Sequence, residues 1–196
     1  MTVFVQLMLT ALMAVTTENI LFSGGIGFSR VLRAARKPRT LGMYSVLVTF
    51  FSLVSILLSS WIGPALVGND MLTYLRPVIF SLCAAAVYLV AAFLLKYFFS
   101  AFFKKYGEIL SPAAINTIVL SMPFAQKSFK LDVASAVAFA LGTGVAFFLA
   151  AAVVARVMVR YKNDDMPKAF SGLPAVLIYI GILSLAFVGF TGTKLF

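Results

Sequence analysis

Residues 15–29, VTTENILFSGGIGFS, decide how this sequence folds, because they interrupt an apolar run that extends from residue 3 to residue 22. The run is apolar enough to enter a bilayer, yet it contains Glu18 and Asn19. A carboxylate at bilayer depth is costly, so it normally faces a protein interior or a water-filled cavity and marks a candidate functional site. We therefore predict that the first span is a broken helix and that Glu18 belongs to an ion or proton pathway. The alternative is that Glu18 is paired with a neighbouring hydroxyl or an arginine.

Small and amide side chains around the interruption indicate how such a break is built. Gly24, Gly25 and Gly27 are expected to allow close helix packing, since small residues let backbones approach in membranes. Asn19, and Asn116 in a later apolar run, are expected to cap half-helices. Both asparagines are also candidates for the ion pathway, because half-helix ends in broken spans bind ions.

The composition indicates that lipid is the solvent of this chain. Hydrophobic residues make up 62% of the 196 residues and charged residues 11%. The mean hydropathy is +1.05, and this composition lies far outside the range of soluble domains. We predict one all-α integral membrane domain over residues 1–196, with a first half at 1–98 and a second at 99–196. The net charge of +10 comes from basic residues in short loops, which argues against nucleic acid as a partner. The single cysteine, Cys83, and the lack of histidine exclude an intrachain disulfide and a multi-cysteine metal site.

Six apolar runs of membrane-spanning character occur in the sequence. Most are close to the ~20 residues that a helix needs to cross the hydrocarbon. The fourth is interrupted by Asn116 and Thr117, with Pro112 and Pro123 near its ends, so it is predicted to be broken like the first. The runs cover residues 3–22, 41–61, 77–95, 109–124, 133–155 and 173–190.

The distribution of basic residues predicts the orientation. Of the 16 lysines and arginines, 12 follow the first, third or fifth span, and the positive-inside rule makes that side cytoplasmic, with both termini outside. The 12 are Arg30, Arg33, Arg36, Lys37, Arg39, Lys96, Lys104, Lys105, Arg156, Arg160, Lys162 and Lys168. The other four are Arg76, Lys127, Lys130 and Lys194.

A short internal similarity relates the two interrupted spans. Residues 17–23, TENILFS, align with residues 115–121, INTIVLS, at an offset of half the chain length. Each half then holds three spans, and an odd number gives the halves opposite orientations in the membrane. We therefore predict six transmembrane helices arranged as two inverted three-helix repeats. The broken first and fourth helices would meet near the midplane.

Three segments make the sequence resemble a known family, the membrane subunits of the Rnf and Nqr complexes. They are ENILFSGGIGFS at 18–29, INTIVLS at 115–121 and MPKAFSGLPAVLIYIGILSLAFVGFTG at 166–192. The similarity is greatest to the A-type subunit of Rnf complexes and to its counterpart, the E-type subunit of the sodium-pumping NADH:quinone reductase. It implies a non-catalytic, multi-pass subunit in a bacterial cytoplasmic membrane. Such a subunit pairs with a homologous, oppositely oriented subunit and with other subunits of the complex.

The resemblance also implies a function and a cofactor. Complexes of this family couple electron transfer from ferredoxin or NADH to the pumping of sodium ions or protons. Two cysteines from each of the paired subunits hold a two-iron two-sulfur cluster. Here the two cysteine positions correspond to Ser29 and Thr117. Hydroxyl groups replace the thiolates that such clusters need, so a cluster held in the family manner is not expected.

These observations predict a subunit that forms half of the membrane core of an Rnf/Nqr-type ion-translocating complex. Two alternatives stay open. One is a relative without redox function that transports an ion or small solute between the half-helices, with Glu18 as the binding group. The other is a cluster-less scaffold paralogue within such a complex.

Overall fold

The structure of this chain, a computed structural model, describes residues 3–66, 70–160, 167 and 170–191, and these contain helices and turns without a strand. Lys162, Lys168 and Lys194, which contribute to the predicted orientation, lie outside the described residues, as do Met166, Ala169 and Gly192 of the carboxy-terminal motif. The helices are α1 (Val3–Val15), α2 (Phe28–Ala35), α3 (Leu41–Ile62), α4 (Asp70–Phe98), α5 (Ser100–Ala114), α6 (Thr117–Ser128), α7 (Val133–Arg160) and α8 (Leu173–Thr191). Two short 3-10 helices, η1 (Pro38–Thr40) and η2 (Pro64–Leu66), precede and follow α3.

Helices able to cross a membrane are present in both halves of the chain. Within the described residues, three helices are long and apolar enough to span a membrane: Pro38–Ile62, Tyr74–Phe98 and Val133–Arg160. α5 and α6, with a bend of 43° between them, form a fourth span if the pair is counted as one. α1 and α8 are apolar but shorter. The all-helical membrane fold is confirmed, whereas the arrangement of six spans as an inverted repeat remains a prediction.

The helices extend beyond most of the predicted apolar runs. α4 begins before the run at 77–95 and continues after it, so Pro77 lies inside the helix. α5 and α6 together reach from Ser100 to Ser128, well outside the run at 109–124. Hydropathy identifies only the part of a helix that fits the hydrocarbon, while polar residues at its ends continue the same backbone hydrogen bonding.

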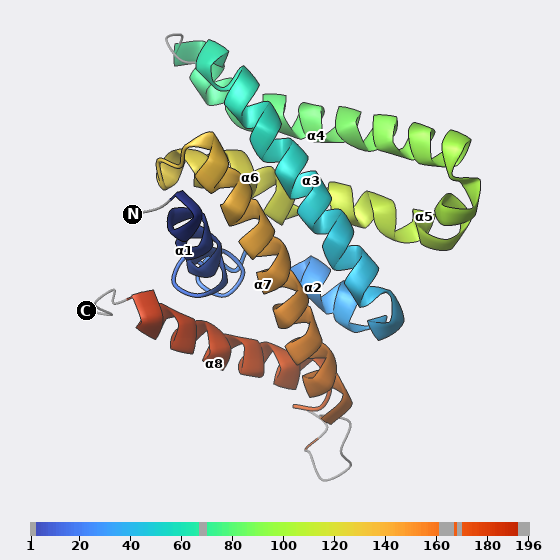
Figure 1. Ribbon diagram of the computed structural model, residues 1–196. Helices are drawn as coiled ribbons and strands as arrows, with labels where there is room; N and C mark the ends of the chain where they lie inside the picture. Colours follow the sequence, from blue (N-terminus) through green and yellow to red (C-terminus); the bar gives the residue numbers. More distant parts are fainter. Residues whose placement is uncertain (1–2, 67–69, 161–166, 168–169, 192–196) are drawn as a thin grey trace.

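The centre of the molecule is α7, which packs between α1 and α3 (Figure 1). Two glycines on α7 permit this. A Cβ atom at Gly142 would overlap the carbonyl oxygen of Ala11 on α1, and one at Gly144 would overlap Oγ1 of Thr49 on α3. Both glycines therefore serve close helix contacts, as small residues do in membrane proteins. The ring of Tyr44 on α3 stacks on that of Phe147 at 5.4 Å between centroids.

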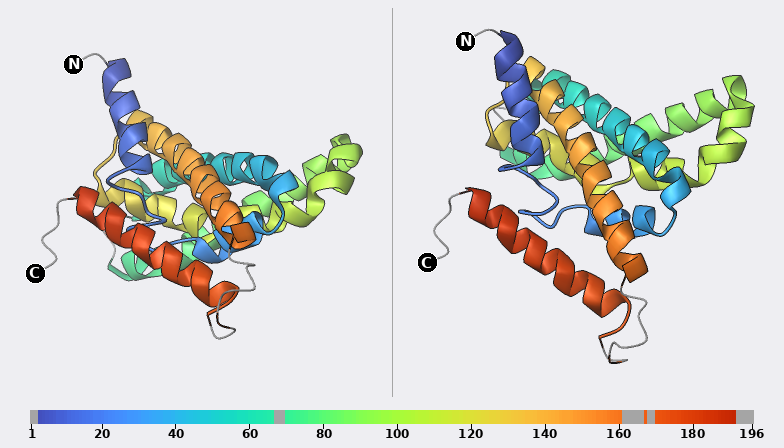
Figure 2. Two further views of the ribbon diagram at one scale, coloured as in Figure 1. Left: turned by 90° about the horizontal axis from the view of Figure 1, so that it is seen from below. Right: turned by 60° about the horizontal axis from the view of Figure 1, so that its bottom comes forward.

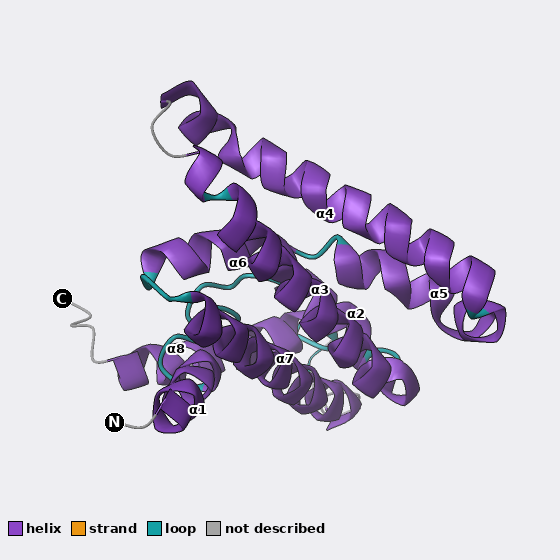
Figure 3. Cartoon of the chain, turned by 45° about the horizontal axis from the view of Figure 1, so that its top comes forward, coloured by secondary structure: helices purple, strands orange, loops and turns teal. Residues whose placement is uncertain are grey.

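The last helix of each half lies at the periphery. α4 runs along α5 on one side of the molecule, and α8 leaves the end of α7 on the other (Figures 2 and 3). Only 11% of the most apolar part of α4 is buried, against 61% for that of α7. Leu82, Leu89 and Phe93 of α4 are each more than 60% exposed. Such a surface suits lipid or another membrane helix.

Candidate functional site: two helix breaks in contact

The first break occupies residues 16–27, between α1 and α2, and is organised by Asn19. The Asn19 side chain is buried, with 2% exposed. Its Nδ2 donates to the carbonyl of Val15 at 2.8 Å, and its Oδ1 accepts from the N–H groups of Leu21 at 3.1 Å and Phe22 at 3.2 Å. One amide therefore satisfies a carbonyl at the end of α1 and two N–H groups within the break, as membrane burial requires.

Aromatic contacts fix the rest of the first break. The buried Phe22 ring stacks on Phe187 of α8, with 4.5 Å between centroids, and meets Phe28 at the start of α2 edge to face. Gly25 and Gly27 have positive φ angles of 64° and 88°. A Cβ at Gly25 would meet nothing within 4 Å, so the expectation of close packing fails there, and this glycine serves the turn instead.

The second break is short, at residues 115–116 between α5 and α6. Asn116 is fully buried and caps α6, because its Oδ1 accepts from the N–H of Ile118 at 3.2 Å. The expectation that the asparagines act as caps is therefore met by Asn116 in the usual manner. Nδ2 of Asn116 has no hydrogen-bond partner among the described residues. Asn19 instead caps an irregular turn.

Side chains of the first half complete the second break. The hydroxyl of Tyr44 on α3 donates to the carbonyl of Pro112 at 2.8 Å. That carbonyl would bond to the N–H of residue 116 if the helix continued, so Tyr44 replaces a lost helical bond. Nη2 of Arg30 on α2 donates to the carbonyl of Ile115 at 3.2 Å. A cation there also suits the negative end of the α5 dipole.

The two breaks touch at Gly27. A Cβ atom at Gly27 would overlap Cγ1 of Ile118 and would lie 3.5 Å from Oδ1 of Asn116. Position 27 requires glycine for two reasons: its φ is positive, and the contact leaves no room for a Cβ atom. Two segments that are distant in the sequence thus meet here, through Gly27 and Ile118 and through Arg30 and Ile115.

Both predicted cluster positions lie beside this contact. Ser29 is in the first turn of α2, two residues after Gly27, and Thr117 is the first residue of α6, next to Ile118. Both side chains are exposed. Among the described residues, no three His, Cys, Asp or Glu side chains gather as metal ligands. Cys83 lies on α4, where it lines an apolar pocket of about 10 Å³ with Phe51 and other residues.

Glu18 lies in the first break and is partly exposed. Its backbone N–H donates to the carbonyl of Met13 at 2.9 Å, while its carboxylate makes no hydrogen bond or ion pair with a described residue. The alternative of a Glu18 carboxylate paired with a hydroxyl or an arginine of the described chain is therefore not observed.

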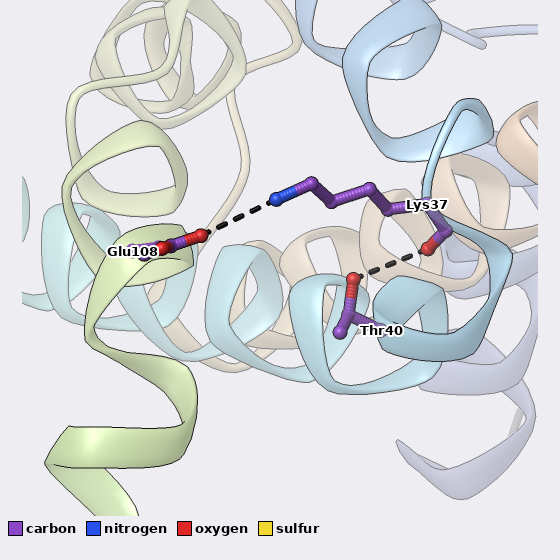
Figure 4. A network of polar contacts seen from close by, with 3 residues as sticks. All are labelled: Lys37, Thr40 and Glu108. Atoms are coloured by element: carbon purple, nitrogen blue, oxygen red, sulfur yellow. Dashed lines mark hydrogen bonds and ion pairs between the residues drawn. The ribbon is translucent and has the colours of Figure 1, made fainter.

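One ion pair connects the loop after α2 with α5. Nζ of Lys37 lies 3.3 Å from Oε2 of Glu108, and the carbonyl of Lys37 accepts a hydrogen bond from Thr40 (Figure 4). The side chains are 66% and 85% exposed, so the pair adds little stability.

Sequence reasoning missed two residues of this site. Arg30 was counted only as an orientation signal, although it is the first basic residue after the break and therefore within reach of a helix end. Tyr44 carried no signal in the sequence, since its partner is a backbone carbonyl of a distant segment.

The fold and site define a helical membrane protein with two interrupted helices that meet inside it. Residues 7–194 match the family described as "Rnf-Nqr subunit, membrane protein", and the chain belongs to this family.

Similar proteins come from several bacteria. The chain is 31% identical, over 121 residues, to the A-type subunit of the proton-translocating ferredoxin:NAD(+) oxidoreductase complex of Clostridium ljungdahlii, and this match covers 62% of the chain and 63% of the relative. It is 24% identical to the A-type subunit of the Na(+)-translocating ferredoxin:NAD(+) oxidoreductase complex of Acetobacterium woodii, covering 93% and 95%. It is 25% identical to the E-type subunit of the Na(+)-translocating NADH-quinone reductase of Neisseria gonorrhoeae, again covering 93% and 95%.

Proposed function

We propose that this chain is a membrane subunit of an Rnf/Nqr-type complex that couples electron transfer from ferredoxin or NADH to ion translocation. It forms half of the membrane core and has no independent catalytic activity. The observation that carries the proposal is the contact between the two breaks, at Gly27 and Ile118, in a chain that matches the family over nearly its whole length.

Copurification from the native membrane tests this proposal. We expect the tagged chain to bring down flavin- or iron-containing subunits, among them a homologous membrane subunit of opposite orientation. The exposed apolar surface of α4 offers room for such a neighbour. A preparation that contains the chain alone, without flavin or iron, would contradict the proposal.

The inverted repeat of residues 1–98 and 99–196 is part of the proposal. Several contacts occur in corresponding pairs: α2 packs on α7 as α6 packs on α3, and α1 packs on α7 as α5 packs on α3. α3 and α7, the corresponding helices of the two halves, pack on each other at the centre. Asn19 and Asn116 stand one position apart in the alignment of the two halves, and each presents Oδ1 to the N–H two residues later.

Reporter fusions at both ends test the orientation in the bacterial cytoplasmic membrane. With an odd number of spans in each half and the basic loops inside, alkaline phosphatase should be active and green fluorescent protein dark at both ends. Opposite behaviour at one terminus would overturn the arrangement of six spans, and opposite behaviour at both would overturn the orientation.

A two-iron two-sulfur cluster does not fit the residues of this chain. Ser29 and Thr117 place neutral, solvent-exposed hydroxyls at the two cysteine positions, and iron–sulfur clusters require thiolates. We therefore assign no electron-transfer step to them. Iron analysis of the complex carrying S29C and T117C is the test. A higher iron content per complex in the double variant than in the wild type supports the assignment, and a fall below the wild-type level on S29A with T117V overturns it.

Glu18 is the proposed ion-pathway carboxylate, with Asn19 and Asn116 at the adjoining helix ends. Its carboxylate makes no internal hydrogen bond or ion pair with described residues and so is available to a mobile cation. Glu18→Gln should reduce ion-coupled activity and leave assembly intact. Unchanged coupling would make the carboxylate structural.

A transporter without redox function is the second candidate, favoured by the hydroxyls at positions 29 and 117. Proteoliposomes that contain the purified chain alone distinguish the two. Cation flux that Glu18→Gln abolishes would favour the transporter, and impermeable vesicles favour the complex subunit.

A further inference from the structure

A groove with a strongly basic rim lies where α7 ends and α8 begins, outside the contact of the two breaks. It has a volume of about 860 Å³. Figure 2 shows α8 diverging from α7 at this end of the molecule. The residues that line the groove include Arg36, Arg156, Arg160, Met158, Leu173 and Val176.

Three arginines from two distant segments meet at this groove. Arg36 follows α2, whereas Arg156 and Arg160 are one turn apart on α7 and so project from the same side of that helix. All three are exposed, and none forms an ion pair with a described residue. Like charges repel at this spacing, so an anion between the guanidinium groups would stabilise the arrangement.

The start of α8 adds to the positive potential. Leu173 and Gly172 line the groove, and α8 is 19 residues long, so the positive end of its dipole faces the same space. The dipole is secondary to the three full charges.

The remaining lining is apolar and continues toward the hydrocarbon. Met158 is partly buried and Val176 is buried. Val159 is 74% exposed and Leu173 is 47% exposed. Away from these arginines, both helices that form the walls are apolar. A soluble anion would use the arginines but leave this apolar surface in contact with water.

We propose that this groove binds an anionic phospholipid, with the phosphate held by Arg36, Arg156 and Arg160 and the acyl chains in contact with α7 and α8. Basic pockets between membrane helices bind anionic headgroups in this way. The arginines lie on the side predicted to be cytoplasmic, although binding itself depends only on membrane insertion and not on the proposed function.

Thermal unfolding of the full chain in nanodiscs tests the proposal. The discs contain phosphatidylcholine alone or with roughly one-third phosphatidylglycerol. The groove variant is R36Q/R156Q/R160Q. The control variant, R39Q/K96Q/K104Q, removes the same charge from exposed positions that do not line the groove.

Phosphatidylglycerol should stabilise the wild type and the control but not the groove variant. Each arginine near the surface contributes roughly fivefold to affinity, so lipid binding measured by native mass spectrometry should fall on the order of 100-fold. Equal losses in both variants would indicate a diffuse basic surface and overturn the site. Lipid binding that the groove variant retains in full would also overturn the site.

Two further measurements complete the test. Glycerol phosphate added in neutral detergent should not reproduce the stabilisation; if it does, the ligand is a free anion and the lipid assignment is wrong. If the triple variant does not fold, the single variants R36Q and R160Q should each weaken lipid binding roughly fivefold.

Discussion

The two helix breaks solve the same physical problem in different ways. The first leaves residues 16–27 without regular helix, and the side chain of Asn19, from within the break, satisfies three of its backbone groups. The second spans only residues 115–116, and its free carbonyls are satisfied by Tyr44 and Arg30 from the other half of the chain. The carbonyl at the end of the first helix is therefore satisfied locally, whereas the carbonyls of the second break are satisfied by tertiary contacts.

This difference bears on how the site responds to change. A break closed from within can form as soon as its own segment inserts in the membrane. A break closed by distant side chains forms only when the two halves pack, since its carbonyls would otherwise face hydrocarbon. The contact at Gly27 joins the two kinds of break, so substitutions there should affect both.

The largest effect is expected for Gly27→Ala. Alanine at this position would have to adopt a strained positive φ of 88°. Its Cβ would also overlap the fully buried Ile118. We expect a loss of about 4 kcal/mol in the free energy of unfolding, from strain and overpacking together. Denaturation in mixed detergent micelles measures it.

Gly25→Ala is the matched control. Its φ of 64° is also positive, but its Cβ would meet nothing within 4 Å, so a loss of only about 1 kcal/mol is expected. Equal losses in the two variants would mean that the breaks are not in close contact at Gly27.

Asn19→Ala should cost more than Asn116→Ala. Asn19→Ala leaves the N–H groups of Leu21 and Phe22 and the carbonyl of Val15 without their partner. We expect a loss of about 3 kcal/mol in the free energy of unfolding. The second removes one cap bond, for about 1 kcal/mol, and also removes the unpaired Nδ2. Unfolding of the two purified variants side by side gives the difference, and the reverse order would contradict local closure of the first break.

Tyr44→Phe should weaken the second break by about 1.5 kcal/mol, because the Pro112 carbonyl loses its donor. Tyr97→Phe, at a 75% exposed position, is the control and should change nothing measurable. The losses from Tyr44→Phe and Asn116→Ala should not add, since both substitutions act on one break. The losses from Tyr44→Phe and Asn19→Ala should add. Double-mutant cycles provide the test.

The smallest effect is expected for Lys37→Met. The ion pair with Glu108 is exposed and links the halves outside the buried contact (Figure 4). Its loss should cost at most about 0.5 kcal/mol and less in high salt. A larger loss that persists in high salt would mean that the halves are held together at their surface and not at the breaks.

Much of the fold follows from local sequence. The positions of α3 and α7 were predicted to within a few residues, because hydropathy at helical length is a strong signal. The interruptions at Asn19 and Asn116 were also predicted, since amides and carboxylates in apolar runs are costly unless the helix breaks. The ends of α4 and α5 were not, because polar residues beyond the hydrocarbon continue a helix without a hydropathy signal.

By itself, the sequence determined that the chain is a helical membrane protein and where its helices are interrupted. These properties depend on residue type and spacing. Only the tertiary structure decided that Gly27 packs on Ile118, that Tyr44 and Arg30 complete the second break, and that Arg36 lines one groove with Arg156 and Arg160. Those contacts join residues far apart in the chain, and helix packing alone brings such residues together.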